Sequence, residues 1–231
     1  MAGATGGPDG RPSGGHAPLG AGVRAVLPLT VAAAGFGISF GILARAAGFG
    51  PLAIVVMSGT TFAGSAQFAA ASVLEAGGAV SAAVAAAVLL NARYLPLGLS
   101  VAPILGGPAW KRFLTAQLVV DESWALAARP DGRFDRGILL GAGMALYVAW
   151  VAGSAVGALG AEALGDPGSL GLDAAFPALF LALLWPQLRA RSAPLAAGLG
   201  AAIALALIPV VPPGVPLIAA AGACLVGLAR R

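Results

Sequence analysis

The chain is poor in the residues that metal sites and most catalytic sites need. Its 231 residues include one cysteine, Cys224, one histidine, His16, and one lysine, Lys111. A single cysteine excludes an internal disulfide and a cysteine metal cluster. His16 lies in the N-terminal tail, so no histidine is available as a ligand or a general base in the apolar part of the chain. The sequence therefore predicts neither a metal site nor a cofactor.

Charged residues are also scarce. They make up 10% of the chain, against 59% for hydrophobic residues, and the apolar residues form runs of about 17 to 25, a length that crosses a bilayer. This composition predicts an all-α fold, a polytopic helical protein in a lipid bilayer with about seven or eight transmembrane helices. The net charge of +4 does not indicate nucleic-acid binding, because the arginines lie at the ends of the apolar runs.

Two regions are expected along the chain. Residues 1–23 are rich in Gly and Pro and predict a disordered tail, whereas residues 24–231 predict a single transmembrane domain. No cleavable signal peptide is expected, since the first apolar run is long enough to span. Turn-forming Gly and Pro residues separate eight candidate spans, at residues 24–47, 51–75, 79–100, 110–128, 136–160, 172–188, 192–210 and 213–229.

The fourth candidate span, residues 110–128, is amphipathic because it contains Lys111, Arg112, Asp121 and Glu122. The sequence leaves open whether this segment spans the membrane, lies in the interface or re-enters.

Basic residues orient the second half of the chain. The cytoplasmic loops are expected to be those flanked by Arg129, Arg133, Arg136, Arg189, Arg191, Arg230 and Arg231. Eight crossings then place both the N-terminus and the C-terminus in the cytoplasm. The first half fits this arrangement less well, because Arg45, Lys111 and Arg112 would lie outside and Glu75 inside.

Glycine pairs spaced four residues apart predict close helix packing. Such a pair lies on one helical face and lets the backbone of a neighbouring helix approach. The pairs are Gly37 and Gly41, Gly137 and Gly141, and Gly153 and Gly157.

The second candidate span contains a polar run, residues 58–67, where polar groups are costly unless they face a cavity, a partner or a substrate. One interpretation is a small-residue packing face, with the hydroxyls bonded to the preceding turn. The other is a broken helix whose free backbone groups and half-helix N-terminus attract a carboxylate, with Gln67 as a further donor and acceptor. The candidate binding residues of this run are Ser58, Thr61, Gly64, Ser65 and Gln67.

The third candidate span is interrupted at residues 91–96. Asn91 and Arg93 precede Pro96, whose missing N–H predicts a local break. Arg93 either extends to the membrane interface or needs a carboxylate, because a lone charge at the bilayer centre costs about 2.5 to 3.5 kcal/mol. That carboxylate belongs to a substrate or to the protein, where the candidates for an ion pair or for coupling are Glu75, Asp121 and Glu122.

These runs also carry a resemblance. The segments Ser58-Gly-Thr-Thr-Phe-Ala-Gly-Ser-Ala-Gln67, Asn91-Ala-Arg-Tyr94 and Asp121-Glu-Ser123 resemble, in order and spacing, the motifs of the AzlC family of branched-chain amino acid permeases. The resemblance covers roughly residues 24 to 228. Tyr94 departs from the family pattern, in which a histidine is expected after Asn-x-Arg.

The resemblance implies an exporter of leucine, isoleucine, valine and similar apolar amino acids in the bacterial inner membrane. It also implies coupling to the proton-motive force and a second, small membrane protein of the AzlD type as partner. In such a transporter the broken spans form a binding site at mid-membrane depth. The aliphatic side chain is then expected to contact Phe62, Phe68 and Leu95.

Three other interpretations differ from a transporter. A passive channel and a structural membrane subunit both fit a polytopic chain, and they lack saturable, gradient-coupled transport. A membrane-embedded enzyme fits poorly, because no histidine is available to activate Ser65 and no phosphate-binding loop precedes Lys111.

Overall fold

The computed structural model describes residues 17–164 and, further along, residues 181, 184–185, 188–189 and 193–223. The described residues form helices and no strands, which confirms the all-α prediction. The expected span at 172–188 and the end of the span expected at 213–229 lie largely outside the described residues. The helices are α1 (Leu19–Ala46), α2 (Pro51–Thr61), α3 (Gly64–Glu75), α4 (Val80–Asn91), α5 (Tyr94–Leu105), α6 (Ala109–Ala116), α7 (Asp121–Ala127), α8 (Arg136–Leu164), α10 (Ala193–Leu207) and α11 (Val215–Ala221).

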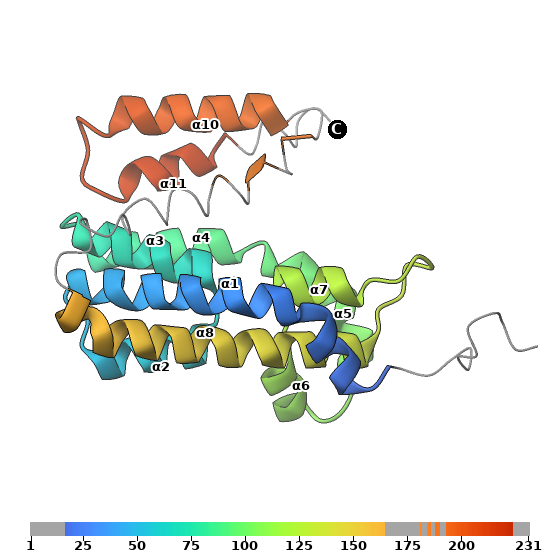
Figure 1. Cartoon of the computed structure of the whole chain (residues 1–231). Helices are drawn as coiled ribbons and strands as arrows, with labels where there is room; N and C mark the ends of the chain where they lie inside the picture. The colour runs from blue at the N-terminus through green and yellow to red at the C-terminus, as the bar shows by residue number, and fades with distance from the viewer. Residues whose placement is uncertain (1–16, 165–180, 182–183, 186–187, 190–192, 224–231) are drawn as a thin grey trace, which may run out of the picture.

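The two long helices, α1 and α8, lie side by side and run in the same direction (Figure 1). Near their starts Gly22 lies against the backbone of Ile138, and near their ends Gly41 lies against Gly157. A Cβ added to Gly157 would come within 2.1 Å of the carbonyl oxygen of Ile38. The predicted glycine pairs therefore do let two backbones meet, because no side chain separates them.

Helices α2 and α3 form a hairpin that does not cross the bundle. Helix α2 starts next to the end of α1 and reaches Tyr147 of α8, whose hydroxyl donates to the carbonyl of Gly59. After a turn at Phe62 and Ala63, α3 runs back toward the end of α1, and its Phe68 contacts Phe40 there. Figure 1 shows both helices in the half of the bundle where α1 and α8 end. The prediction of one crossing at residues 51–75 is therefore wrong, although the predicted break is confirmed.

The next segment crosses the bundle with a bend and is followed by two short helices. Helices α4 and α5 meet at an angle of 49° and together are apolar enough to form one span. Helices α6 and α7 lie at the end where α1 and α8 begin (Figure 1), and Leu105, Ala127 and Leu139 pack together there. Among the open choices for residues 110–128, the structure therefore favours an interfacial α6 and a re-entering α7.

Within the described residues, α1 and α8 are each long and apolar enough to cross a membrane, and the α4 and α5 pair is the third candidate. Helix α1 begins at Leu19, a turn earlier than the expected start at residue 24. Helices α10 and α11 pack on each other, and α11 packs on α4.

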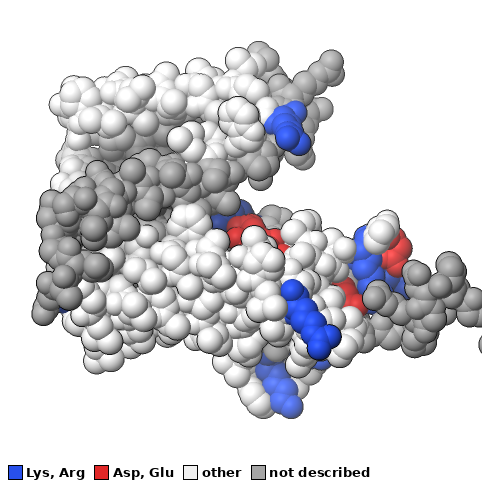
Figure 2. All heavy atoms as spheres, in the orientation of Figure 1, with Lys and Arg blue, Asp and Glu red and all other residues white. Residues whose placement is uncertain are grey.

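Most described basic residues lie at one end of the bundle, which we call the basic end. It includes the starts of α1 and α8 and the loops next to α6 and α7, and Figure 2 shows most blue side chains there. Its basic residues are Arg24, Lys111, Arg112, Arg129, Arg133 and Arg136. Arg45 ends α1 and Glu75 ends α3 at the opposite end. The hairpin shape of α2 and α3 places Lys111 and Arg112 with the other basic residues.

Asp135 fixes the start of α8 at the basic end. Its carboxylate accepts hydrogen bonds from the backbone N–H groups of Gly137 and Ile138, as an N-cap does, and also from the N–H of Ala17. Arg129 forms an ion pair with the same carboxylate. Burial by itself would raise the pKa of Asp135, but the bonds from Arg129 and the backbone outweigh it and hold this pKa below its usual value.

Candidate functional site

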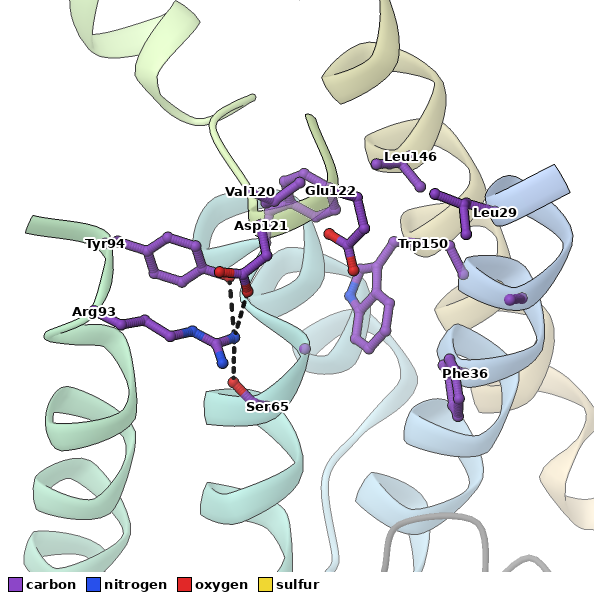
Figure 3. Close-up of a pocket in the computed structure, with 14 residues that line it drawn as sticks. Leu29, Phe36, Ser65, Arg93, Tyr94, Val120, Asp121, Glu122, Leu146 and Trp150 are labelled. Atoms are coloured by element: carbon purple, nitrogen blue, oxygen red, sulfur yellow. Dashed lines mark hydrogen bonds and ion pairs between the residues drawn. The ribbon is translucent and has the colours of Figure 1, made fainter. Parts of the chain in front are cut away.

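A cavity of about 260 Å³ lies at the middle of the bundle (Figure 3). Its walls come from α1, the turn between α2 and α3, the bend between α4 and α5, the start of α7, and α8. The lining residues of α1 run from Leu29 to Phe36, and those of α8 are Leu146 and Trp150. These residues lie near the centres of the two long helices, so the cavity is at mid-membrane depth. Ligand cavities for larger molecules start at about 300 Å³, so this volume suits a small metabolite.

The turn between α2 and α3 forms one wall of the cavity. Phe62 has a φ of 37°, in the left-handed region, which stops α2 and reverses the chain. Ala63 has a non-helical backbone, and α3 then starts at Gly64. The first N–H groups of a helix have no partner inside it, so the start of α3 presents free donors and a partial positive charge at the cavity.

Gln67 holds this turn in place. Its amide nitrogen donates to the hydroxyl of Ser58 over 3.1 Å, and its amide oxygen accepts from the N–H of Ala63 over 3.2 Å. The same oxygen accepts a hydrogen bond from the indole N–H of Trp150 over 3.1 Å. Ser58 and Gln67 are fully buried. Gln67 therefore joins α2, α3 and α8 at a point where the backbone ladder is broken, and its hydrogen bonds satisfy groups that would otherwise be unpaired.

The bend between α4 and α5 brings Arg93 to the cavity. One guanidinium nitrogen of Arg93 lies 3.0 Å from the hydroxyl of Ser65 and 3.0 Å from a carboxylate oxygen of Asp121. Tyr94 lies beside the guanidinium, whose carbon is 5.2 Å from the ring centre. Arg93 therefore points inward to a carboxylate of the protein, as Figure 3 shows, and does not extend to the interface.

The start of α7 carries two carboxylates into the cavity. Residues 118–120 are not helical and lie beside the second turn of α8, where Gly143 leaves room for the carbonyl of Leu118. The buried hydroxyl of Ser123 accepts a hydrogen bond from the N–H of Val120 and donates to the carbonyl of Leu118. These bonds hold the segment so that Asp121 and Glu122 reach the cavity from the basic end.

The structure divides the predicted site residues into two groups. The residues that line the cavity are Gly64, Ser65, Arg93, Asp121 and Glu122. Ser58 and Gln67 lie behind them, and Thr61 is exposed at the end of α2. The side-chain oxygen of Asn91 is buried at the bend with no hydrogen-bond partner among the described residues. Glu75 ends α3, away from Arg93.

The sequence reasoning missed the apolar wall of the cavity. Leu29, Phe36, Leu146 and Trp150 come from α1 and α8, which read as ordinary apolar spans. Phe62 lines the cavity as expected, whereas Phe68 packs behind Trp150 and Leu95 is 70% exposed on the outer surface. The glycine pairs were the available signal. Close packing at Gly37 and Gly153 brings α1 and α8 together, so residues of both helices can line one cavity.

The cavity has a charged side and an apolar side. Arg93, Asp121 and Glu122 provide charges of both signs beside an apolar wall. Within the described residues no group of three or more His, Cys, Asp or Glu side chains could hold a metal ion. Figure 2 shows red and blue side chains inside a notch in the middle of the face in view.

Comparisons with known proteins agree with the motif resemblance. The family model described as AzlC protein matches residues 28–164. The branched-chain amino acid transport protein AzlC of Bacillus subtilis strain 168 is 29% identical over 171 residues, which cover 71% of this chain and 67% of the relative. A membrane protein of Haemophilus influenzae is 31% identical over 203 residues, covering 83% of this chain and 82% of the relative.

The inner membrane protein YgaZ of Escherichia coli K12 is 28% identical over 186 residues, covering 77% of this chain and 76% of the relative. No solved structure matches the chain. The match to the family model includes the α2 and α3 hairpin, the α4 and α5 bend, and the start of α7, so all three helix interruptions at the cavity lie within it. This chain therefore belongs to the AzlC family.

Proposed function

We propose that the chain is a secondary transporter of branched-chain amino acids in the bacterial inner membrane, and that the central cavity binds the substrate. One observation carries this proposal: three interruptions of the helices meet at one cavity at mid-membrane depth, which has charges of both signs beside an apolar wall. An aliphatic amino acid has a matching carboxylate, ammonium group and apolar side chain. The name of the Bacillus subtilis relative supports the same substrate class.

The cavity suggests how the zwitterion is held. Its carboxylate binds the guanidinium of Arg93, the hydroxyl of Ser65 and the free N–H groups at the start of α3. Its ammonium group binds Glu122, which lines the same cavity. Its side chain then points to the wall formed by Leu29, Phe36, Leu146 and Trp150.

The ion pair between Arg93 and Asp121 offers a way to couple transport to protons. The guanidinium nitrogen that lies 3.0 Å from Asp121 also lies 3.0 Å from Ser65, so a carboxylate bound there competes with Asp121. A displaced Asp121 would be a carboxylate at membrane depth without its cation, which is costly unless the ammonium group of the substrate or a proton neutralises it. The ammonium group and a proton would then compete for Asp121 and Glu122, as the exchange of an exported amino acid for an incoming proton requires. Glu75 lies too far along α3 to take part in this exchange.

The distribution of charge supports an orientation. Arg and Lys are enriched in cytoplasmic segments, so the basic end is assigned to the cytoplasm together with the N-terminus. The C-terminus, also expected in the cytoplasm, lies outside the described residues. Export and a small AzlD-type membrane partner complete the proposal, on the resemblance of the motifs.

Counterflow in proteoliposomes tests this function. The chain and its small partner are reconstituted together, loaded with unlabelled leucine and supplied with labelled valine. We expect saturable accumulation of label, and net flux that stops when a protonophore removes the pH gradient. Flux that does not saturate would indicate a channel, and no flux of any amino acid would refute the proposal.

Matched variants test the site. We expect Arg93→Ala to abolish counterflow at unchanged abundance in the membrane, whereas Arg24→Ala removes the same charge from an exposed position on α1 and should leave counterflow intact. Asp121→Asn should keep exchange of substrate but lose dependence on the pH gradient. Equal activity of Arg93→Ala and Arg24→Ala would show that Arg93 does not bind substrate.

A further inference from the structure

The indole of Trp150 is fixed from several sides. Its N–H donates to the amide oxygen of Gln67 over 3.1 Å. Its ring stacks on Phe40, with ring centres 6.0 Å apart and planes at 22°, and it meets the edge of Phe68 at 6.2 Å. Trp150 is 6% exposed. Any rotation of this ring would break the hydrogen bond of Gln67, which also holds the turn between α2 and α3.

Gly64 lies against the same ring. A Cβ added to Gly64 would lie 2.8 Å from Cη2 and 3.0 Å from Cζ3 of Trp150. Only a residue without a side chain leaves the ring where it is, since the ring is backed by Phe40 and Phe68. Gly64 and Trp150 both line the cavity.

The ring lies across the cavity from Arg93. Figure 3 shows Trp150, Leu29 and Phe36 on the side of the cavity away from Arg93 and Tyr94. Leu29 is exposed on α1, whereas the ring of Trp150 is held by Gln67 and by two aromatic neighbours. A side chain that extends from a carboxylate bound at Arg93 would therefore meet one rigid surface.

We propose that Trp150, held by Gln67 and supported by Gly64, sets the upper size limit of the amino acid side chain that this transporter accepts. The inference rests on the proposed function and deepens it, because it assigns selectivity for short aliphatic side chains to one aromatic ring. Gln67 is then a positioning residue that acts through Trp150, and it does not touch the substrate.

Two variants should shift selectivity in opposite directions. Trp150→Phe removes part of the indole and enlarges the cavity, so phenylalanine and methionine should compete better against labelled leucine. Gly64→Ala pushes the ring into the cavity, so alanine should compete better and leucine worse. A change of about one methylene in an apolar pocket alters discrimination by about 10-fold or more, and we expect shifts of about 10-fold in the inhibition ratios.

The experiment is competitive counterflow in proteoliposomes, with labelled leucine or alanine and a series of unlabelled amino acids of rising size. Ratios of inhibition constants are compared within each variant, so they do not depend on protein abundance. Trp110→Phe on α6 makes the same substitution at an exposed site outside the cavity and should keep the wild-type ratios.

The outcomes separate this inference from the function it rests on. Wild-type counterflow of leucine with unchanged ratios in Trp150→Phe and Gly64→Ala would overturn the size limit and leave the transporter proposal standing. Absence of wild-type counterflow would overturn both. If Trp150→Phe fails to accumulate in the membrane, the ratio of inhibition constants measured for Gly64→Ala decides whether the ring sets the size limit.

Discussion

The contact between α1 and α8 leads to a sharp prediction about stability, because the two helices meet with no side chain between them. A Cβ added to Gly157 would lie 2.1 Å from the carbonyl oxygen of Ile38, and ordinary contact starts at 3.4 Å. The obstructing atom is backbone, so it cannot move aside as a flexible side chain does. Gly157→Ala therefore forces the helices apart by roughly 1 Å, a gap that forfeits about a quarter to a half of the dispersion attraction of each separated pair.

The expected cost follows from overpacking. Added methyl groups in a well-packed contact cost about 1 to 3 kcal/mol, and for a chain of this size each kcal/mol lowers the melting temperature by about 2 to 4 °C. We therefore expect Gly157→Ala to melt about 2 to 12 °C below the wild type. The measurement is the fraction of monodisperse protein in detergent after heating, followed by size-exclusion chromatography.

Gly160 provides the matched control. It lies one turn further along α8, and a Cβ added there would meet nothing within 4 Å. Because alanine favours a helix over glycine by up to about 1 kcal/mol, Gly160→Ala should melt at or slightly above the wild-type temperature. If Gly157→Ala is as stable as Gly160→Ala, the close parallel packing of α1 and α8 is wrong.

Two further predictions test the topology and the basic end. In a variant with Cys224→Ser, we expect Ala76→Cys to react with an impermeant thiol reagent from outside the cell, and Ala109→Cys to react only after permeabilisation, since α2 and α3 form a hairpin. The opposite labelling pattern would show that residues 51–75 cross the membrane. Asp135→Asn should melt about 2 to 4 °C lower at neutral pH, from the loss of about 1 kcal/mol at an N-cap. Because the pKa of Asp135 is lowered by folding, its stabilisation is complete above the ordinary aspartate pKa of 3.8 and is lost as pH falls through the lower folded value. Below that pH the melting temperature of the wild type should therefore approach that of Asp135→Asn. Substitution of the exposed Asp131 by Asn should give no such pH-dependent change relative to the wild type. Melting temperatures of wild type and Asp135→Asn that differ by the same amount at every pH would contradict this role.

Local sequence rules predicted the interruptions of the helices well. Pro96 and the polar run at 58–67 indicated breaks, and the structure has them at Ala92–Arg93 and Phe62–Ala63. The spacing of the glycine pairs likewise predicted a close helix contact. These features depend on a few neighbouring residues, so a pattern in the sequence is enough to reveal them.

The partners of those residues depend on the whole fold and were harder to predict. Asp121 was one of three candidate carboxylates for Arg93, and only the fold places it at 3.0 Å. Gln67 was predicted as a ligand because its amide offers both a donor and an acceptor, but in the structure its partners are Ser58, Ala63 and Trp150. No spacing rule links residues 67 and 150, since their contact arises from the turn that brings α3 against α8.

The charges of the first half of the chain could have indicated the hairpin at residues 51–75, which hydropathy could not. A crossing at residues 51–75 put Lys111 and Arg112 on the side opposite to Arg129 and Arg133, against the usual enrichment of basic residues on one side. Hydropathy cannot distinguish a span from a hairpin that enters and leaves on the same side, because both bury a similar number of apolar residues. The direction of the chain after the hairpin does distinguish them, since it reverses the side of the loops that follow α3 and α5. One hairpin thus accounts both for the distribution of basic residues and for a helix start at the middle of the membrane, beside Arg93. The same polar run that breaks the helix therefore determines on which side of the membrane the following loops lie.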